Sequence, residues 1–369
     1  LHSVAAKRTP TDFRPGIRAL MDEGSLVTCV MIFLNGEKYI AEAIDSILAQ
    51  TYRNWELVLV DDGTTDGATA IAQDYAQRHP NRVRYIDHPG HENRGMSASR
   101  NAGVRAGRGH FVSFLDADDV WLPDRLEKFV KIAGRFPEAG MIYGPTLYWY
   151  SWAEERGVAP PVDGQDDFAG HLDLPVNRLI PPPVAMRRFL TTKGGCLPGI
   201  CSLLIRRDAY DDIGGFEPDF RGLYEDQAFL SKMTLAYPVV VIVDVLDKYR
   251  QHSESCCYRS AESGEYHAED YHPARFTYLE WLRTYCRVND IADAVIDREI
   301  RRQTRPYRWP IIIHATHFAS RLEQSGKAFL QRVLPDPVTR RAQSALNRMR
   351  DRRRERRARE QATSAKDNF

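Results

Sequence analysis

The chain has 369 residues, of which 43% are hydrophobic and 27% are charged, as is typical of a folded globular protein. This length allows two domains with a core that needs neither disulfides nor a structural metal, and the composition excludes disordered, collagen-like and coiled-coil chains. The longest uncharged run, residues 139–153, and the run at residues 194–205 are both shorter than the roughly 20 residues that span a bilayer. We therefore expect no transmembrane helix, and residues 1–25 show no secretory signal.

The net charge of +1 conceals an uneven distribution of charge along the chain. Residues 298–359 contain 18 Lys and Arg but only 5 Asp and Glu, whereas residues 1–297 contain 32 Lys and Arg against 43 Asp and Glu. An acidic body with a basic tail indicates two separate roles. The six cysteines include no Cys-x-x-Cys pair, which is typical of neither a zinc site nor a disulfide framework and favours a cytoplasmic location.

Strand and helix patterns alternate through the first 135 residues. Apolar runs predict strands at 26–34, 56–60, 82–86 and 110–115. Apolar residues spaced three and four apart predict helices at 40–48, 68–76, 97–106 and 123–133. This order predicts an α/β fold, in which a mainly parallel sheet is flanked by helices.

The second half of the chain has weaker patterns. Further strands are predicted at 139–143, 202–205 and 239–245, with a helix at 226–236. Residues 151–183 contain several prolines and are predicted to form a long irregular loop. From residue 270 onward only helices are predicted, and residues 348–360 are nearly all Arg, Glu and Ala.

Polar clusters follow three of the predicted strands, at Asn35, at Asp61-Asp62 and at residues 116–119. Ligands bind beyond the carboxyl ends of parallel strands, so we expect these clusters to converge on one crevice. The closely spaced carboxylates of Asp116, Asp118 and Asp119 repel one another unless a cation neutralises them, and their oxygens suit Mg²⁺ or Mn²⁺. The alternative for this short Asp-x-Asp pattern is a solvated acidic turn.

Other polar residues near these strand ends fit a nucleotide ligand. Asp62 could accept a hydrogen bond from a base or a ribose, and Arg94 and Arg100 lie in or after a cationic loop that suits a diphosphate. Asp226 begins a predicted helix, where a carboxylate acts either as a cap or as a general base. The first strand is not followed by Gly-x-Gly-x-x-Gly, and no P-loop is present, which disfavours dinucleotide-binding and P-loop enzymes.

Residues 26–255 resemble the family 2 glycosyltransferases, which are inverting enzymes with the GT-A fold. The resemblance depends on the order and spacing of short motifs. These are NGEKY at 35–39, LAQTY at 48–52, VDDG at 60–63, NRG at 93–95, SRNAG at 99–103, FLDADD at 114–119, GGF at 214–216, ED at 225–226 and YRQH at 249–252. The first strand departs from the family, because it ends in Ile-Phe-Leu-Asn where relatives often have Pro-x-Tyr-Asn.

The resemblance implies roles for eight residues. Asp62, Arg94, Arg100 and Asp116 would bind the nucleotide sugar, and Asp226 would be the catalytic base. Asp118 and His252 would be metal ligands, and Glu225 would have an acceptor-side role. Independently of the resemblance, Trp152 is a ninth candidate, because its ring could stack on a sugar on the acceptor side, and packing in the core is the alternative.

The function implied is transfer of a sugar from a nucleoside-diphosphate sugar, with UDP as the expected nucleotide, to an acceptor hydroxyl. The product would be a polysaccharide, a glycolipid or another glycoconjugate, and the acceptor a glycan or a lipid-linked molecule. The cofactor would be Mg²⁺ or Mn²⁺. The alternatives are a metal-dependent nucleotidyltransferase, which would use the same carboxylates, and a nucleotide-sugar-binding protein without catalysis.

We expect four segments along the chain. These are an N-terminal extension at 1–25, the GT-A domain at 26–255, a helical region at 256–335 and a basic tail at 336–369. The basic tail could rest on an anionic membrane surface at the inner face of the plasma membrane. A solvated or disordered Arg-rich segment is the alternative. Nucleic-acid binding is disfavoured because the body is acidic and no aromatic residue is interleaved with the arginines between Phe329 and the terminal Phe369.

Overall fold

The computed structural model describes residues 24–157, 165–192, 197–263 and 272–308. The chain divides into two compact units, residues 1–304 and 305–369, and both sheets belong to the first. The basic tail and the part of the expected helical region after residue 308 lie outside the described residues. None of the described helices combines the length and the apolar character that crossing a bilayer requires.

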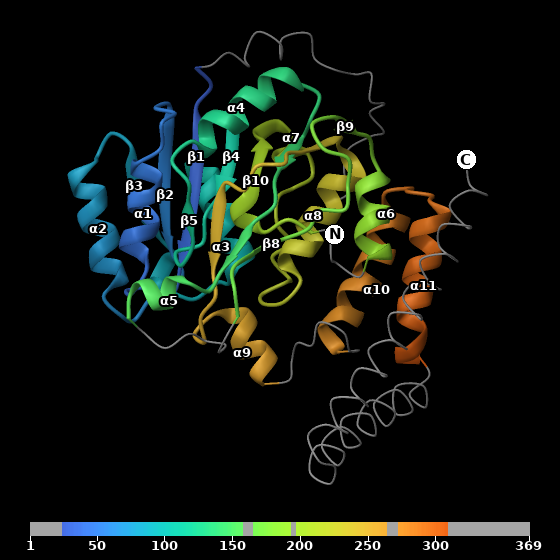
Figure 1. The fold of residues 1–369 in the computed structure, drawn as a ribbon. Helices are drawn as coiled ribbons and strands as arrows, with labels where there is room; N and C mark the ends of the chain where they lie inside the picture. The colour runs from blue at the N-terminus through green and yellow to red at the C-terminus, as the bar shows by residue number, and fades with distance from the viewer. Residues whose placement is uncertain (1–23, 158–164, 193–196, 264–271, 309–369) are drawn as a thin grey trace, which may run out of the picture. The chain divides into compact units, whose positions relative to one another are not determined.

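Within the described residues, the large sheet has eight strands in the order β3-β2-β1-β4-β10-β6-β11-β9 (Figure 1). In this order their bounds are Val83–Asp87, Trp55–Asp61, Val27–Phe33, Phe111–Phe114, Leu203–Arg206, Met141–Tyr143, Val239–Val241 and Leu179–Ile180. The four N-terminal strands pair in parallel, while β10 is antiparallel to both of its neighbours and β9 is antiparallel to β11. The predicted α/β fold with a mainly parallel sheet is confirmed.

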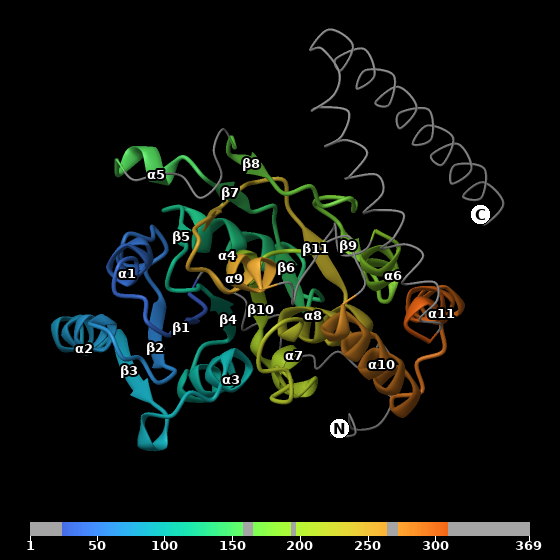
Figure 2. The ribbon, with the colours of Figure 1, turned by 90° about the horizontal axis from the view of Figure 1, so that it is seen from below.

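Helices cover both faces of the large sheet (Figures 1 and 2). Helices α1, α2 and α4 pack on one face, and α3, α6, α7, α8 and α10 pack on the other. In chain order α1 to α11 are Ile40–Leu48, Ala68–Arg78, Met96–Ala106, Arg125–Arg135, Trp152–Glu155, Val184–Thr191, Arg207–Asp212, Glu225–Ala236, Cys256–Glu262, Pro273–Val288 and Ala294–Arg308.

Strand β1 shows why both faces are covered. All seven of its residues are buried, and successive side chains point into different cores. Val30 and Ile32 join the core beneath α3 and α8, whereas Met31 and Phe33 join the core beneath α1 and α4. Gly103 brings α3 close to the sheet, because a Cβ at this position would collide with Val30.

A second sheet was not predicted from the sequence. Its four strands have the order β5-β12-β7-β8, with bounds Val120–Trp121, Asp247–Arg250, Leu147–Trp149 and Phe168–Ala169. The expectation of an irregular loop over 151–183 is therefore wrong in part, because this stretch contributes α5, β8 and β9. Helices α10 and α11 confirm the helices expected after residue 270, and α10 shares a core with α8. The domain boundary expected at residue 255 stays a prediction.

Candidate functional site

The carboxyl ends of β1, β2 and β4 lie side by side because these strands are parallel and adjacent. The backbone N–H of Asp62, just after β2, donates a hydrogen bond to the carbonyl of Phe33 at the end of β1. Asp116 follows β4 at the same edge of the sheet. The predicted convergence of polar clusters at this edge is therefore what the structure shows.

Arg100 connects this edge to the start of α8. Its guanidinium, only 2% exposed, donates from Nη1 to Oε1 of Glu225 at 2.5 Å and from Nη2 to Oδ1 of Asp116 at 2.9 Å. Glu225 is 125 residues away in sequence and Asp116 is 16 residues away. One buried cation thus joins the Asp-x-Asp turn to the helix that begins with Glu225 and Asp226. The structure favours a positioning role for Arg100, and direct contact with a donor stays a prediction.

The turn formed by residues 116–119 is tied to the end of β12 by three contacts. Oδ2 of Asp118 lies 2.9 Å from Nε2 of His252. Arg250 donates from Nε to the carbonyl of Asp118 at 2.7 Å and from its backbone N–H to Oδ1 of Asp119 at 3.0 Å. The two residues expected to hold a cation, Asp118 and His252, therefore lie together although they are 134 residues apart in sequence.

The electrostatics of this turn favour a bound cation. Burial and the neighbouring carboxylate of Asp118 raise the pKa of Asp119 well above its ordinary value. Burial also raises the pKa of Asp116, and this effect exceeds the lowering that the positive charge of Arg100 causes. His252 is only 7% exposed, and its Nδ1 has no hydrogen-bond partner among the described residues. A carboxylate beside an imidazole is a donor set that suits a divalent cation such as Mn²⁺, so these residues fit the expected metal.

A different group of potential ligand atoms lies nearby but is occupied by internal contacts. Ligand atoms of Asp61, Asp87 and His91 lie within 4.8 Å of one another. His91 contacts Asp87 through Nδ1 and the carbonyl of Thr64 through Nε2. Asp61 accepts hydrogen bonds from the N–H of Thr64 and the hydroxyl of Thr69. Because both nitrogens of His91 and both oxygens of Asp61 are engaged, we interpret this group as a structural network.

Asp62 holds the cationic loop against the sheet. Its carboxylate accepts from the backbone N–H of Arg94 at 2.7 Å and from that of Gly95 at 3.1 Å. The side chain of Arg94 is about half exposed and pairs with Glu92 at 2.8 Å. The predicted donor-binding residues Asp62 and Arg94 thus belong to one local assembly, in which Asp62 fixes the backbone and Arg94 presents its guanidinium to solvent.

Replacing Asp62 by Ala is expected to loosen this loop. Two backbone N–H groups lose their acceptor in a buried environment, which costs about 2 kcal/mol of folding stability. Urea denaturation of the variant and the wild type measures this change, and Asp74→Ala on the exposed side of α2 serves as the control. A stability within 0.5 kcal/mol of wild type would show that water replaces the carboxylate, contrary to the contacts described above.

Asp226 lies in the first turn of α8, beside Glu225. Oδ1 of Asp226 accepts from the backbone N–H of Gln227 at 2.7 Å, and the backbone N–H of Asp226 donates to Glu225. Burial, and then the negative charge of Glu225, raise the pKa of Asp226 to about 8. A carboxylate with a pKa near the working pH is a far better proton acceptor than an ordinary aspartate. The helix-cap alternative for Asp226 is compatible with its contact to Gln227, but it does not explain the raised pKa.

The start of α8 is held in an unusual backbone conformation. Tyr224 precedes Glu225 with a φ of 72°, in the left-handed region that a bulky residue rarely adopts. Its ring stacks on Tyr278 of α10, with centroids 5.3 Å apart, and its hydroxyl lies 3.0 Å from Nε2 of His272. The orientation of Asp226 thus depends on contacts to α10. Sequence reasoning missed Tyr224, because nothing in the local pattern signals a positive φ.

Arg250 is another residue that the sequence did not reveal as part of the site. Its side chain is fully buried, its Nη2 pairs with Glu42 at 2.5 Å, and its guanidinium lies over the rings of Trp149 and Trp152. Trp152 is 6% exposed and donates its indole N–H to the carbonyl of Gln251 at 2.7 Å. These contacts favour the packing alternative for Trp152, and its acceptor-side role stays a prediction.

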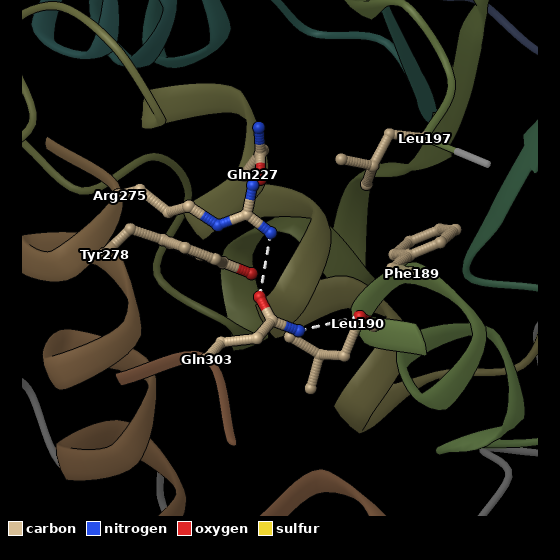
Figure 3. A pocket seen from close by; sticks show the side chains of 7 residues that line it. All are labelled: Phe189, Leu190, Leu197, Gln227, Arg275, Tyr278 and Gln303. Carbon is tan, nitrogen blue, oxygen red and sulfur yellow. Dashed lines mark hydrogen bonds between the residues drawn. The ribbon is translucent and has the colours of Figure 1, made fainter. Parts of the chain in front are cut away.

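A pocket behind the start of α8 is formed by helices α6, α8, α10 and α11 (Figure 3). Arg275 donates to Oε1 of Gln303 at 2.8 Å, and Gln303 donates to the carbonyl of Leu190 at 2.8 Å. Gln227, the neighbour of Asp226, also lines the pocket, but none of the nine predicted site residues does. The pocket therefore lies between α8 and the helices that pack against it, and it is not the predicted site.

The amino-acid sequence of the chain is similar to those of known glycosyltransferases. The family model described as glycosyl transferase family 2 matches residues 28–214, just over half of the chain. An uncharacterized glycosyltransferase of Rickettsia felis is 30% identical over 230 residues, which are 62% of this chain and 35% of that protein. Glycosyltransferase GlyA of Streptococcus pneumoniae is 34% identical over 132 residues, which are 36% of this chain and 18% of that protein. The chain thus spans about a third or less of the length of these two relatives.

Solved structures share the fold at low sequence identity. Staphylococcus aureus TarS 1–349 in complex with UDP-GlcNAc superposes with a TM-score of 0.55 and 17% identity, covering 77% of this chain and 73% of that one. The mannosyltransferase PcManGT from Pyrobaculum calidifontis, in complex with GDP-Man and Mn²⁺, gives 0.52 and 15%, covering 93% and 82%. These likenesses confirm the predicted fold class. With the family match over half of its length, the chain belongs to glycosyl transferase family 2.

Proposed function

We propose that the chain catalyses an inverting transfer of a sugar from a nucleoside-diphosphate sugar to an acceptor hydroxyl. The observation that carries this proposal is the double ion pair of Arg100, which holds Asp116 at the Asp-x-Asp turn and Glu225 beside Asp226 in one site. A donor held at the turn and a base at the start of α8 are then close enough to act on the same reaction. Membership of the family and the nucleotide-sugar complexes of the similar structures support this proposal.

On the donor side, Asp62, Arg94 and Asp116 are the proposed contacts to the nucleotide and its sugar. Asp62 and Asp116 follow the carboxyl ends of β2 and β4, where α/β sheets bind ligands. Arg94 lies in the loop after β3, and its backbone N–H donates to Asp62. Asp118 and His252 would hold the divalent cation, which when bound offsets the negative charge that develops on the leaving diphosphate. Complexes with UDP, UDP-GlcNAc and GDP-Man among the similar structures support a nucleotide-sugar donor, and UDP is the nucleotide that we propose.

On the acceptor side, Asp226 is the proposed general base. Its carboxylate accepts the proton of the acceptor hydroxyl as the oxygen bonds to the anomeric carbon and the bond from that carbon to the diphosphate breaks. This single displacement inverts the anomeric configuration and forms no covalent enzyme intermediate. Glu225 cannot replace Asp226 as the base, because its carboxylate is buried and already paired with Arg100.

A turnover screen tests this proposal against its alternatives. The chain is incubated with Mn²⁺, a panel of nucleotide sugars and a panel of p-nitrophenyl glycosides as acceptors. We expect release of a nucleoside diphosphate together with a glycosylated product. Release of a sugar 1-phosphate, with the nucleoside monophosphate transferred to the acceptor, would identify a nucleotidyltransferase. Thermal stabilisation by a nucleotide sugar without any product would identify a binding protein without catalysis.

Replacing His252 by Ala is expected to weaken the metal site. If His252 and Asp118 hold the cation together, loss of the imidazole raises the Mn²⁺ concentration needed for half-maximal activity by at least about tenfold. The maximal rate at saturating Mn²⁺ falls much less, because the remaining donors still bind the ion. The measurement is a Mn²⁺ titration of activity after treatment with EDTA, with His79→Ala at the end of α2 as the control. An unchanged titration would remove His252 from the proposed ligand set.

We propose a glycan or lipid-linked acceptor in polysaccharide or glycoconjugate synthesis, and either Mg²⁺ or Mn²⁺ as the cofactor. A cytoplasmic location and contact of the basic tail with an anionic membrane surface stay predictions from the sequence. Within this proposal, Glu225 contributes by orienting α8 through its ion pair with Arg100, so its expected acceptor-side role becomes an indirect one.

A further inference from the structure

The small sheet carries a row of aromatic side chains on one face. Tyr249 on β12 pairs with Tyr148 on β7, and Tyr148 pairs with Phe168 on β8. Directly paired residues in neighbouring strands project from the same face of a sheet. The three rings therefore form a continuous row across β12, β7 and β8, which are neighbouring strands of the small sheet.

The rings of this row contact one another closely. Tyr148 and Phe168 are stacked, with centroids 4.7 Å apart and an interplanar angle of 5°. Tyr148 and Tyr249 meet edge to face at 5.5 Å, and Tyr150 flanks Phe168 at 6.4 Å. Phe168 is 45% exposed, which is unusual for a phenylalanine, and the tyrosines are half-buried. The row ends at a large apolar ring that is open to solvent.

The opposite face of the small sheet is buried against the rest of the domain. There Trp149 and Arg250 are paired in register, and the guanidinium of Arg250 lies 4.4 Å from the centre of the Trp149 ring. Both side chains are buried. This face packs against the rest of the domain and supports the Asp-x-Asp turn, so the aromatic row does not form part of that core cluster.

The aromatic row begins beside the candidate active site. The hydroxyl of Tyr249 lies near enough to Asp119 and Asp118 for the charges of both carboxylates to act on it. The backbone N–H of the next residue, Arg250, donates to the carboxylate of Asp119 in the Asp-x-Asp turn. The row thus leads from the position proposed for the donor sugar to the edge of the small sheet at Phe168.

We propose that Tyr249, Tyr148 and Phe168 bind the saccharide chain of the acceptor, with its growing end at Asp226. This inference rests on the proposed function. The row carries no formal charge, and aromatic rings with hydroxyl groups at their edges match a pyranose, which has apolar C–H faces and hydroxyls around its rim. A row of three rings would contact sugars beyond the one that reacts. The acceptor would accordingly be an oligosaccharide or a longer glycan.

The test compares a short with a long acceptor. The probes are the p-nitrophenyl monosaccharide that the turnover screen selects and the tetrasaccharide glycoside of the same sugar. For Phe168→Ala we expect KM for the tetrasaccharide to rise about tenfold, with kcat and the KM values for the monosaccharide and the donor unchanged. Phe168→Trp retains a stacking surface and should restore tight binding. Val288→Ala, at a 43% exposed position on α10, is the control for loss of an exposed apolar side chain.

Each outcome supports the proposal or overturns it. A selective loss of tetrasaccharide affinity in Phe168→Ala, restored by Trp, supports the aromatic row as an acceptor site. Equal effects on both acceptors, or no effect on either, overturn it while leaving the proposed transferase function intact. If the wild-type chain transfers sugar to neither probe although it is folded and binds a nucleotide sugar, the proposed function itself fails, and this inference fails with it.

Discussion

Replacing Asp226 by Asn is expected to lower kcat for sugar transfer by about a thousandfold while donor affinity stays within twofold of wild type. The amide cannot accept the proton of the acceptor hydroxyl, but its oxygen can still accept the hydrogen bond from the backbone N–H of Gln227. The fold of α8 and the contacts at the Asp-x-Asp turn are therefore preserved. Steady-state kinetics with the donor found in the screen, together with donor titration by calorimetry, separate these two effects.

The raised pKa of Asp226 also predicts how the folding stability of this variant depends on pH. In the folded chain the pKa is about 8, against 3.8 for an ordinary aspartate, so the unfolded state ionises at a lower pH than the folded state. Stability is therefore lost as the pH rises from about 4 to 8, and the whole cost is present above pH 8. Asn removes this cost. Because Asp226 is partly exposed, we expect a gain of about 2 kcal/mol at pH 8 and almost none at pH 4.

The same pKa predicts the pH dependence of the wild type. If Asp226 is the base, transfer needs its ionised form, and the rate should rise as the pH increases through about 8. Gln227→Glu, which places a further carboxylate next in sequence, is the matched control and should retain activity. Wild-type activity in Asp226→Asn, or a rate that is flat from pH 6 to 9 with chemistry limiting, would show that Asp226 is not the base.

Replacing Arg100 by Met is expected to destabilise the fold and to impair transfer together. The variant leaves the buried carboxylate of Glu225 without its partner and frees the partly exposed Asp116. Breaking a buried ion pair by removing one member typically costs 3–5 kcal/mol, and we expect about 3 kcal/mol because Asp116 can be hydrated. Arg100→Lys should recover only part of this loss, since a single ammonium group does not provide the planar fork that reaches two carboxylates.

Urea denaturation and donor titration together measure this effect. A matched control is Arg105→Met, which removes an exposed arginine from the last turn of the same helix. If Arg100 positions α8, the variant should lose more in kcat than in donor affinity, even at temperatures at which it is fully folded. A loss confined to donor affinity would instead show that Arg100 binds the donor directly, as the sequence resemblance implies.

The N-terminal half of the fold was predictable because its elements have strong periodic patterns. The residues of β1 and β2 are all buried in the structure, and apolar residues spaced three and four apart define α1. The small sheet could not be predicted in the same way. Strands β5 and β8 have only two residues each, and β12 has the sequence DKYR, which lacks the apolar alternation of an ordinary strand.

The candidate site was predictable only in part. Parallel strand order was enough to bring Asp62 and Asp116 to one edge of the sheet, because the carboxyl ends of adjacent parallel strands must coincide. It could not reveal that Arg100 joins that edge to α8 or that Arg250 stabilises the Asp-x-Asp turn. Both depend on side-chain contacts between residues more than 100 positions apart, which no local pattern encodes. The conformation of Tyr224 likewise depends on α10 and not on its sequence neighbours.

The anomeric configuration of the product tests the central claim most directly. That claim is that a donor held at the Asp-x-Asp turn is attacked in one displacement by a hydroxyl that Asp226 deprotonates. Proton NMR of the reaction, followed from its start with an α-linked nucleotide sugar, reports the configuration of the new linkage. The account predicts a β-linked product that appears together with the nucleoside diphosphate. An α-linked first product would require two displacements or a front-side reaction, and would contradict the role of Asp226.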